Sequence, residues 1–218
     1  MTISELILEV LLPGLGETLF MVLLSTLFAV LIGFAPAIAL VITDDKGLRP
    51  NKSVYKILDL IINLLRSFPF VILMIALIPF TRFVAHTSIG MTAAVVPLTI
   101  GAAPFAARVI ESALKEVDPG IIEAAKSMGA STAQIIFRVM LKEALPSIVL
   151  GVTLTVISVI GYSAMAGTIG AGGLGSIAYN YGYLGFKTNI MVYTIIILII
   201  IVQIFQSLGN YAYKKLSR

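Results

Sequence analysis

The sequence predicts an all-α, polytopic membrane protein with five transmembrane helices, and three observations lead to this prediction. Of the 218 residues, 59% are hydrophobic and only 12% are charged, with a mean hydropathy of +1.05. Soluble domains carry roughly 25% charged residues. Several stretches also lack any Lys, Arg, Asp or Glu over about 20 residues, the length that a helix needs to cross a bilayer.

The amino-terminal residues 1–13 predict a short amphipathic helix that lies in the membrane interface. Its apolar residues recur at helical spacing, and its two acids, Glu5 and Glu9, fall on the opposite face. We expect Pro13-Gly14 to end this helix. The uncharged run that follows predicts the first spanning helix at residues 19–41, with bends at Gly33 and Pro36.

Basic residues fix the expected orientation of the spans. Residues 43–56 carry four Lys or Arg, whereas residues 1–42 carry none. Because cytoplasmic loops are enriched in basic residues, the amino terminus is expected outside and this loop inside. A second span at 58–80 then runs outward and a third at 89–112 returns. Pro97 and Pro104 are one heptad apart, which bends the third span toward one side and suits either a cavity wall or plain packing.

The remaining chain fits the same orientation. A cytoplasmic loop at 115–145 precedes a fourth span at 146–167, a Gly-rich external segment, a fifth span at 188–213 and a basic cytoplasmic tail at 214–218. On this topology the external loops keep only Arg82 and Lys187. The basic residues therefore lie between apolar runs, so the net charge of +4 does not indicate nucleic-acid binding.

The fourth span carries one stripe of small or polar side chains at steps of four and three residues: Gly151, Thr155, Ser158, Tyr162 and Met165. Either the stripe packs closely against a neighbouring helix, as small residues do, or it lines a translocation path. If it lines a path, we expect Tyr162 and Met165 to narrow or gate it.

The second span carries a charge whose role the sequence leaves open. Asp59, Asn63, Arg66 and Phe70 fall on one face, and Arg66 lies roughly ten residues into the span. A charge inside the bilayer must be compensated. Arg66 either pairs with Asp59, with carbonyl groups or with a partner chain, or it contacts the carboxylate of a substrate.

Neither catalysis nor nucleotide binding is indicated. Gly170 to Gly175 formally satisfies the dinucleotide fingerprint, but that motif also needs an acid about twenty residues further on, and no Asp or Glu follows Glu143. The segment also lacks the Lys of a phosphate-binding loop, so it is interpreted as flexible backbone. The chain has no cysteine, and its single His86 has no partner at metal-binding spacing.

The cytoplasmic loop contains the most informative motif. Asp118 precedes Pro119 as a helix N-cap, Gly129 can end that helix, and Ser131 with Gln134 forms a capping box for a second helix. The first of these helices exposes small residues beside an acid, Glu123-Ala-Ala. It is therefore either a helix that enters a groove on another protein or a surface helix that connects two spans.

This loop resembles the signature loop of ABC importer permeases, in which Glu-Ala-Ala is followed by a Gly and, about sixteen residues later, by Leu-Pro, here Leu145-Pro146. Over nearly the whole chain, further segments are similar to the methionine importer permeases: Arg66-Ser-Phe-Pro69-Phe, Pro79-Phe-Thr-Arg82, Thr87-Ser-Ile-Gly90, Val96-Pro-Leu-Thr99, Gly101-Ala-Ala-Pro104-Phe, Gly161-Tyr-Ser-Ala-Met165, Gly170-Ala-Gly-Gly-Leu-Gly175 and Tyr179-Asn-Tyr-Gly-Tyr183.

The resemblance implies the type I permease fold, a second copy of the chain, two ATPase subunits that bind ATP and Mg, and an external substrate-binding lipoprotein. It implies that Glu123, Ala124, Ala125 and Gly129 belong to a coupling helix that rests in a cleft of the ATPase. It also implies a multi-pass protein among the lipids of the bacterial cytoplasmic membrane, importing methionine or a closely related amino acid.

Three other functions remain to be compared with this expectation. An ion-coupled carrier would place a titratable acid near the membrane centre, whereas Asp59 lies close to the inner surface and Glu111 at a helix end. An ABC permease for another small amphipathic substrate would have the same general features. A purely structural membrane subunit would leave the polar stripe without a role.

Overall fold

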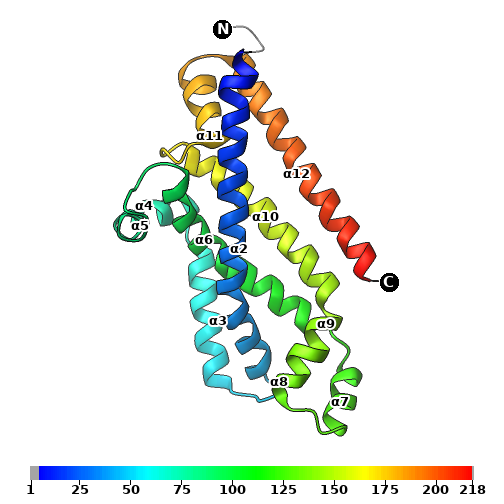
Figure 1. The fold of residues 1–218 in the computed structure, drawn as a ribbon. Coiled ribbons are helices and arrows are strands. Elements are labelled where there is room, and N and C mark those ends of the chain that lie inside the picture. The colour runs from blue at the N-terminus through cyan, green and yellow to red at the C-terminus, as the bar shows by residue number, and fades with distance from the viewer. Residues whose placement is uncertain (1–4, 218) are drawn as a thin grey trace.

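The computed structural model describes residues 5–217, and this part of the chain is helical with no strand. Four helices are long and apolar enough to cross a membrane: α2 (Leu12–Thr43, extended by the π-helix Leu6–Leu11), α6 (Met91–Lys115), α10 (Leu145–Gly167) and α12 (Thr188–Leu216). They correspond to the first, third, fourth and fifth predicted spans (Figure 1). The all-α membrane fold is therefore confirmed.

The second predicted span is broken into three helices: α3 (Lys52–Ser67), α4 (Phe70–Ala76) and α5 (Ile78–Ala85). Helices α3 and α4 bend by 99° and form a fifth span only if the pair is counted together. The prediction of one continuous helix at 58–80 is therefore wrong. The cause is Pro69, because a proline disfavours helical geometry at the preceding residue, and Phe68 is extended with ψ 127°.

The amino-terminal helix does not end where the sequence suggested. The π-helix Leu6–Leu11 continues directly into α2, so the predicted break at Pro13-Gly14 is wrong; residues 1–4 lie outside the described part. The wider π-helical turn, in which the N–H of Leu12 donates to the carbonyl of Ile7, accommodates the proline ring without a break.

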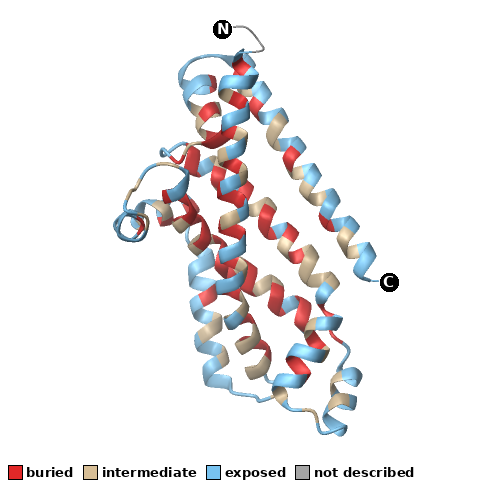
Figure 2. Ribbon diagram, viewed as in Figure 1, coloured by how far each residue is buried: buried red, intermediate tan, exposed pale blue. Residues whose placement is uncertain are grey.

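Helices α2, α6 and α10 form the centre of the molecule. Figure 2 shows that buried residues concentrate on these helices, whereas α12 is largely exposed. Small residues let α2 approach α6 closely: a Cβ atom on Gly33 would lie 2.7 Å from the carbonyl oxygen of Ala103. Helix α12 packs mainly on α10.

The Gly-rich segment after α10 is folded against α2. It forms α11 (Gly173–Ile177) and a π-helix (Ala178–Leu184). The N–H of Gly173 donates to Glu17 Oε2 at 2.6 Å, and the N–H of Leu174 donates to Thr18 Oγ1 at 2.9 Å. A Cβ atom at Gly172 would lie only 2.6 Å from the Glu17 carboxylate. The interpretation as flexible backbone is wrong, because these glycines permit close approach.

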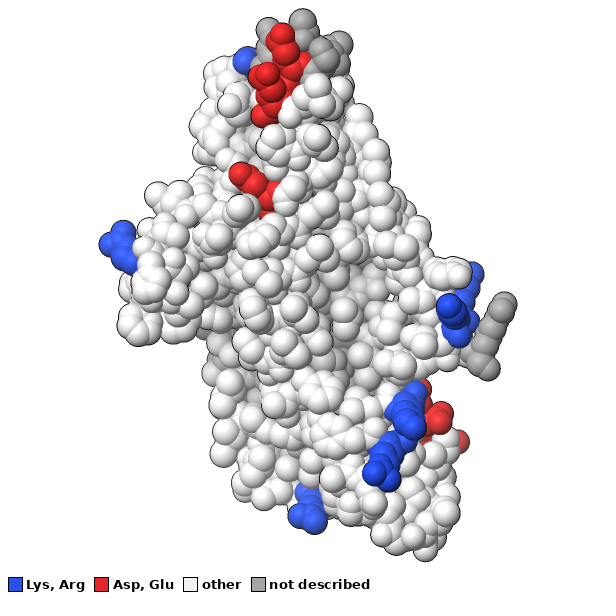
Figure 3. Space-filling view, in the orientation of Figure 1, with Lys and Arg blue, Asp and Glu red and all other residues white. Residues whose placement is uncertain are grey.

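The opposite end of the molecule holds the short helices between α6 and α10: α7 (Pro119–Ser127), α8 (Thr132–Gln134), a π-helix (Ile135–Met140) and α9 (Leu141–Glu143) (Figure 1). Charged side chains lie mostly toward the two ends and the two margins of the face in Figure 3, and the middle of that face is almost free of them. This distribution suits a body that crosses a bilayer.

Candidate functional site

Helix α7 is fixed at both of its ends. The Asp118 side chain accepts a hydrogen bond from the N–H of Gly120 at 2.7 Å. Gly129 adopts a left-handed φ of +79°, which lets the next residue, Ala130, donate to the carbonyl of Ala125 at 3.1 Å. The capping box between Ser131 and Gln134 is present. The helix, turn, helix prediction is confirmed.

The outer side of α7 is open to a partner. None of its residues is buried, and Glu123, Ala124 and Gly129 are exposed, while Ala125 is half-buried against the core. Met128, which sequence reasoning missed, is 88% exposed beside them. An exposed methionine next to small residues is a feature of surfaces that bind another protein. The sequence feature that could have identified Met128 is its position in the turn before Gly129.

A cluster of charges joins α3 to the carboxyl ends of α2 and α6. Arg108 pairs with Asp59 on α3 and, at 2.8 Å, with Glu111, which is only 3% exposed. Lys115 pairs with Glu111 at 2.8 Å and with Asp44 at 2.7 Å. Sequence reasoning missed this cluster, although Arg108, Glu111 and Lys115 recur at three- and four-residue spacing on one helix face.

Asp44, just beyond the end of α2, is held in its charged form. The Lys115 ammonium and the backbone N–H of Lys46 both donate hydrogen bonds to its carboxylate, and together they lower the pKa of Asp44. Asp44 is therefore ionised at neutral pH, and its ion pair with Lys115 ties α2 to α6.

Arg66 does not pair with Asp59, so that alternative is wrong. The two residues are seven positions apart on α3, about 10 Å along the helix axis, and Asp59 is bound instead by Arg108 from α6. Among residues 5–217, no acid lies within 4.0 Å of the Arg66 guanidinium. Its central carbon lies 6.0 Å from the centre of the Phe105 ring.

The polar stripe on α10 divides into two parts. Gly151 and Thr155 are buried, and the Thr155 hydroxyl donates to the Gly151 carbonyl at 2.9 Å, so in this structure Thr155 packs inside the chain. Ser158 and Tyr162 are half-buried, and Met165 is 47% exposed. Only the part from Ser158 to Met165 is accessible.

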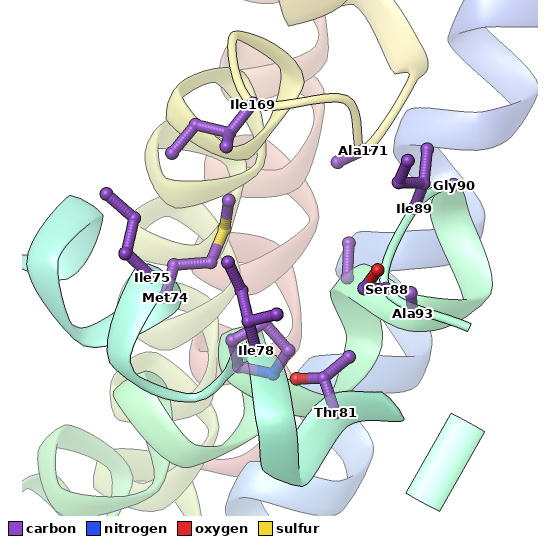
Figure 4. A pocket seen from close by; sticks show the side chains of 12 residues that line it. Met74, Ile75, Ile78, Thr81, Ser88, Ile89, Gly90, Ala93, Ile169 and Ala171 are labelled. Atoms are coloured by element: carbon purple, nitrogen blue, oxygen red, sulfur yellow. The ribbon is translucent and has the colours of Figure 1, made fainter. Parts of the chain in front are cut away.

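An outer pocket of about 240 Å³ lies between α4, α5, the start of α6 and the loop after α10 (Figure 4). Its walls are mostly apolar, with the hydroxyl-bearing residues Thr81 and Ser88 as polar members. Within the described chain, Thr81 Oγ1 is buried and makes no hydrogen bond. No charged residue lines this pocket.

A smaller pocket of about 130 Å³ lies at the bend between α3 and α4, and we call it the aromatic pocket. Its walls include Arg66, Phe68, Phe70, Gly101, Phe105 and Tyr162. The rings of Phe70 and Tyr162 stack with their centres 4.6 Å apart and their planes inclined by 11°. Among the described residues, no group of three His, Asp or Glu side chains could hold a metal ion.

A helical membrane body with the exposed helix α7 at one end and pockets beside an accessible polar stripe is the arrangement of a transport permease. Comparison of the chain with known proteins identifies its family within this class. The family described as binding-protein-dependent transport system inner membrane component matches residues 29–218, and the chain belongs to this family.

Two relatives and one solved structure illustrate the similarity. A probable D-methionine transport system permease protein of Vibrio cholerae is 47% identical over 202 residues, covering 93% of this chain and 90% of that protein. The methionine import system permease protein of Bacillus subtilis is 46% identical over 171 residues, covering 78% and 77%. A chain from the MetNI methionine ABC transporter in an inward-facing conformation superimposes with a TM-score of 0.96 at 43% identity, over 100% of both chains. The predicted type I importer permease fold is confirmed.

Proposed function

We propose that this chain is the membrane-spanning subunit of an ATP-binding-cassette importer that moves methionine across the cytoplasmic membrane into the cell. The main observation in support is the likeness to the MetNI transporter, with a TM-score of 0.96 over the whole of both chains. At 43% identity the likeness includes the helices that would line the path, in addition to the docking helix.

The energy source in this proposal is a separate ATPase that binds ATP and Mg. Helix α7 would rest in a cleft of that subunit through Glu123, Ala124, Ala125 and Gly129. Because α7 is capped at both ends and contacts the π-helix Ile135–Met140, a shift of the ATPase would move α7 as a rigid unit. Alternating access then follows, because such contacts differ between the two states.

The path would lie between two copies of the chain, lined in each by the accessible part of the α10 stripe. Ser158 and Tyr162 would supply polar groups, and Met165 would narrow the path as a gate. The external binding lipoprotein would deliver substrate to the end of the molecule that carries α11, with the amino terminus outside and the carboxyl terminus inside. This orientation agrees with the concentration of Lys and Arg in the segments assigned to the inside.

An ion-coupled carrier is a weaker explanation of the same chain. Such a carrier needs an acid that can release and take up an ion, and Glu111 is the buried candidate on α6. Its carboxylate is already paired with both Arg108 and Lys115. It is therefore suited to holding helices together and poorly suited to ion exchange.

The test is methionine uptake by proteoliposomes that contain the chain, its ATPase and its binding protein. We expect radiolabelled methionine to accumulate when ATP is supplied on the ATPase side, and to remain at background with a non-hydrolysable analogue. A protonophore should leave the uptake unchanged. Uptake that follows the proton gradient without ATP, or ATP-driven uptake that excludes methionine, would contradict the proposal.

A further inference from the structure

We propose that the aromatic pocket is a substrate site inside the permease, in which Arg66 binds the carboxylate of a zwitterionic amino acid and the aromatic rings hold its unbranched apolar side chain. This inference rests on the proposed function and specifies where the substrate pauses on its way through the membrane. Nothing in the comparisons assigns a substrate site to this chain.

The first support is the unpaired charge of Arg66. Arg66 is exposed on the single chain in the last turn of α3, and a guanidinium that faces a bilayer is costly unless something compensates it. Asp59 is bound to Arg108, and no other acid of the described chain lies within ion-pair distance of Arg66. Its place in the last turn of α3 gives partial compensation from the carbonyl end of the helix. A carboxylate would complete the compensation, because guanidinium binds it through two parallel hydrogen bonds.

The second support is the chemistry of the walls. Phe70 and Tyr162 stack at 4.6 Å, and Phe105 lies under the Arg66 guanidinium at 6.0 Å. A thioether makes favourable contacts with the edges of such rings. The ring faces and the Tyr162 hydroxyl also suit the ammonium group of an amino acid. The pocket therefore offers a partner to each part of the substrate.

The third support is size. A volume of about 130 Å³ equals roughly four water molecules at about 30 Å³ each. This volume accommodates a side chain of about four non-hydrogen atoms, with the carboxylate of the amino acid at Arg66. Gly101 contributes to this room, because a Cβ atom there would lie 3.1 Å from the Phe70 ring and would press on it. The pocket thus favours one slender side chain over a bulky one.

The fourth support is position. Tyr162 belongs both to the aromatic pocket and to the accessible stripe of α10, between Ser158 and Met165. The pocket therefore opens beside the proposed path at the level of the gate. The outer pocket in Figure 4 is larger, but it has no charged residue among its walls and could not bind a carboxylate strongly. Of these two pockets, only the aromatic pocket has a charged residue that could bind a carboxylate.

Photolabelling tests the site directly. The complete transporter in proteoliposomes, with its ATPase and binding protein, is irradiated during ATP-driven turnover with a diazirine analogue of methionine, and the labelled peptides are mapped by mass spectrometry. We expect label on residues 65–73, 101–105 and 162, and its removal by excess methionine. Label confined to the outer pocket or to other parts of the chain overturns the site.

Substitution of Arg66 gives an independent measurement. In Arg66→Gln we expect both the pocket label and the methionine moved per ATP hydrolysed to fall by about tenfold, as expected for the loss of one charge-assisted pair. Arg66→Lys should retain part of both. Arg82→Gln, which makes the same change at an exposed arginine on α5, serves as the matched control.

The outcomes separate the two proposals. If the wild-type transporter accumulates methionine but Arg66→Gln moves as much per ATP as Arg82→Gln does, the site is wrong and the function stands. If the wild type shows no ATP-dependent methionine uptake, the proposed function fails, and the site fails with it. Should Arg66→Gln not assemble, the label map of the wild type and of Arg66→Lys decides.

Discussion

Gly33 sets the distance between α2 and α6, the two helices at the centre of the molecule. A Cβ atom there would lie 2.7 Å from the carbonyl oxygen of Ala103 and 2.8 Å from the nitrogen of Ala107. Both are backbone atoms of a helix, which cannot move aside as the end of a flexible side chain can. The contact therefore depends on the missing side chain.

We expect Gly33→Ala to destabilise the folded chain by about 1–3 kcal/mol, the usual cost of overpacking. Gly16→Ala on the same helix is the control, since no atom lies within 4 Å of its added Cβ, and a gain of about 0.5–1 kcal/mol is expected there. Thermal unfolding in detergent measures both. An equal or higher midpoint for Gly33→Ala than for the wild type would contradict the packing.

Residue-scale predictions from the sequence succeeded where the interaction was local. The caps at Asp118, Gly129 and Ser131 involve atoms a few positions apart, so residue type and spacing determined them. The pairing of Asp59 failed because its partner, Arg108, comes from another helix 49 positions along the chain. Spacing within one helix could not reveal that the arginine of α6 takes the place of Arg66, and so could not show that Arg66 lacks an acidic partner among residues 5–217.

The turn after α7 is the element whose geometry most depends on one residue. Gly129 has a φ of +79°, and no atom lies within 4 Å of a Cβ atom built there. A substitution is therefore costly for the backbone alone, by about 1–2 kcal/mol for the left-handed conformation. Losing the left-handed turn at residue 129 would loosen the carboxyl end of α7. It would also change the position of α7 relative to the π-helix that follows.

We expect Gly129→Ala to lower the methionine moved per ATP hydrolysed, because a loosened α7 transmits less of the ATPase motion. Gly161→Ala on α10 is a matched control, with equally open space at the Cβ position and without a positive φ. The ratio of uptake to ATP hydrolysis in proteoliposomes provides the measurement. Equal ratios in the two variants would show that α7 tolerates the change.

At the scale of helices, the break within a predicted span was the feature hardest to predict from the sequence. Hydropathy predicted one span at 58–80, since Asp59 and Arg66 are the only charged residues in this range and residues 67–80 carry no charge. Pro69 was a visible signal for a break, but the sequence alone does not say whether a proline kinks a span or turns it by 99°. That turn creates the aromatic pocket, so the pocket was not predictable even though Arg66 and Tyr162 were singled out.

Across the whole molecule, the order of the four long spans followed from composition, because charge-free runs of sufficient length are rare outside membranes. The association of α2, α6 and α10 did not follow, since all spans are similarly apolar. Small residues such as Gly33 decide which helices approach closely. Helix α12 buries least of the four long spans, which leaves its outer face for lipid or for a second copy.

Orientation in the membrane can be tested without removing any native cysteine, because the chain has none. We expect Asn189→Cys, at the exposed start of α12, to react with a membrane-impermeant maleimide in intact spheroplasts. Ser127→Cys, at the exposed end of α7, should react only after the membrane is permeabilised. The reverse pattern would place the amino terminus inside and contradict the proposed topology.

The hydrogen bonds from Gly173 and Leu174 to Glu17 and Thr18 connect residues 156 positions apart. During synthesis the ribosome makes Glu17 and Thr18 long before Gly173, so the first helix enters the bilayer with Glu17 still lacking the N–H of Gly173 and Thr18 still lacking the N–H of Leu174. The amino-terminal end of the protein therefore reaches its final structure only after the last quarter of the chain has emerged from the ribosome. A prematurely terminated product lacks both hydrogen bonds, so Glu17 and Thr18 keep acceptors that the complete chain fills.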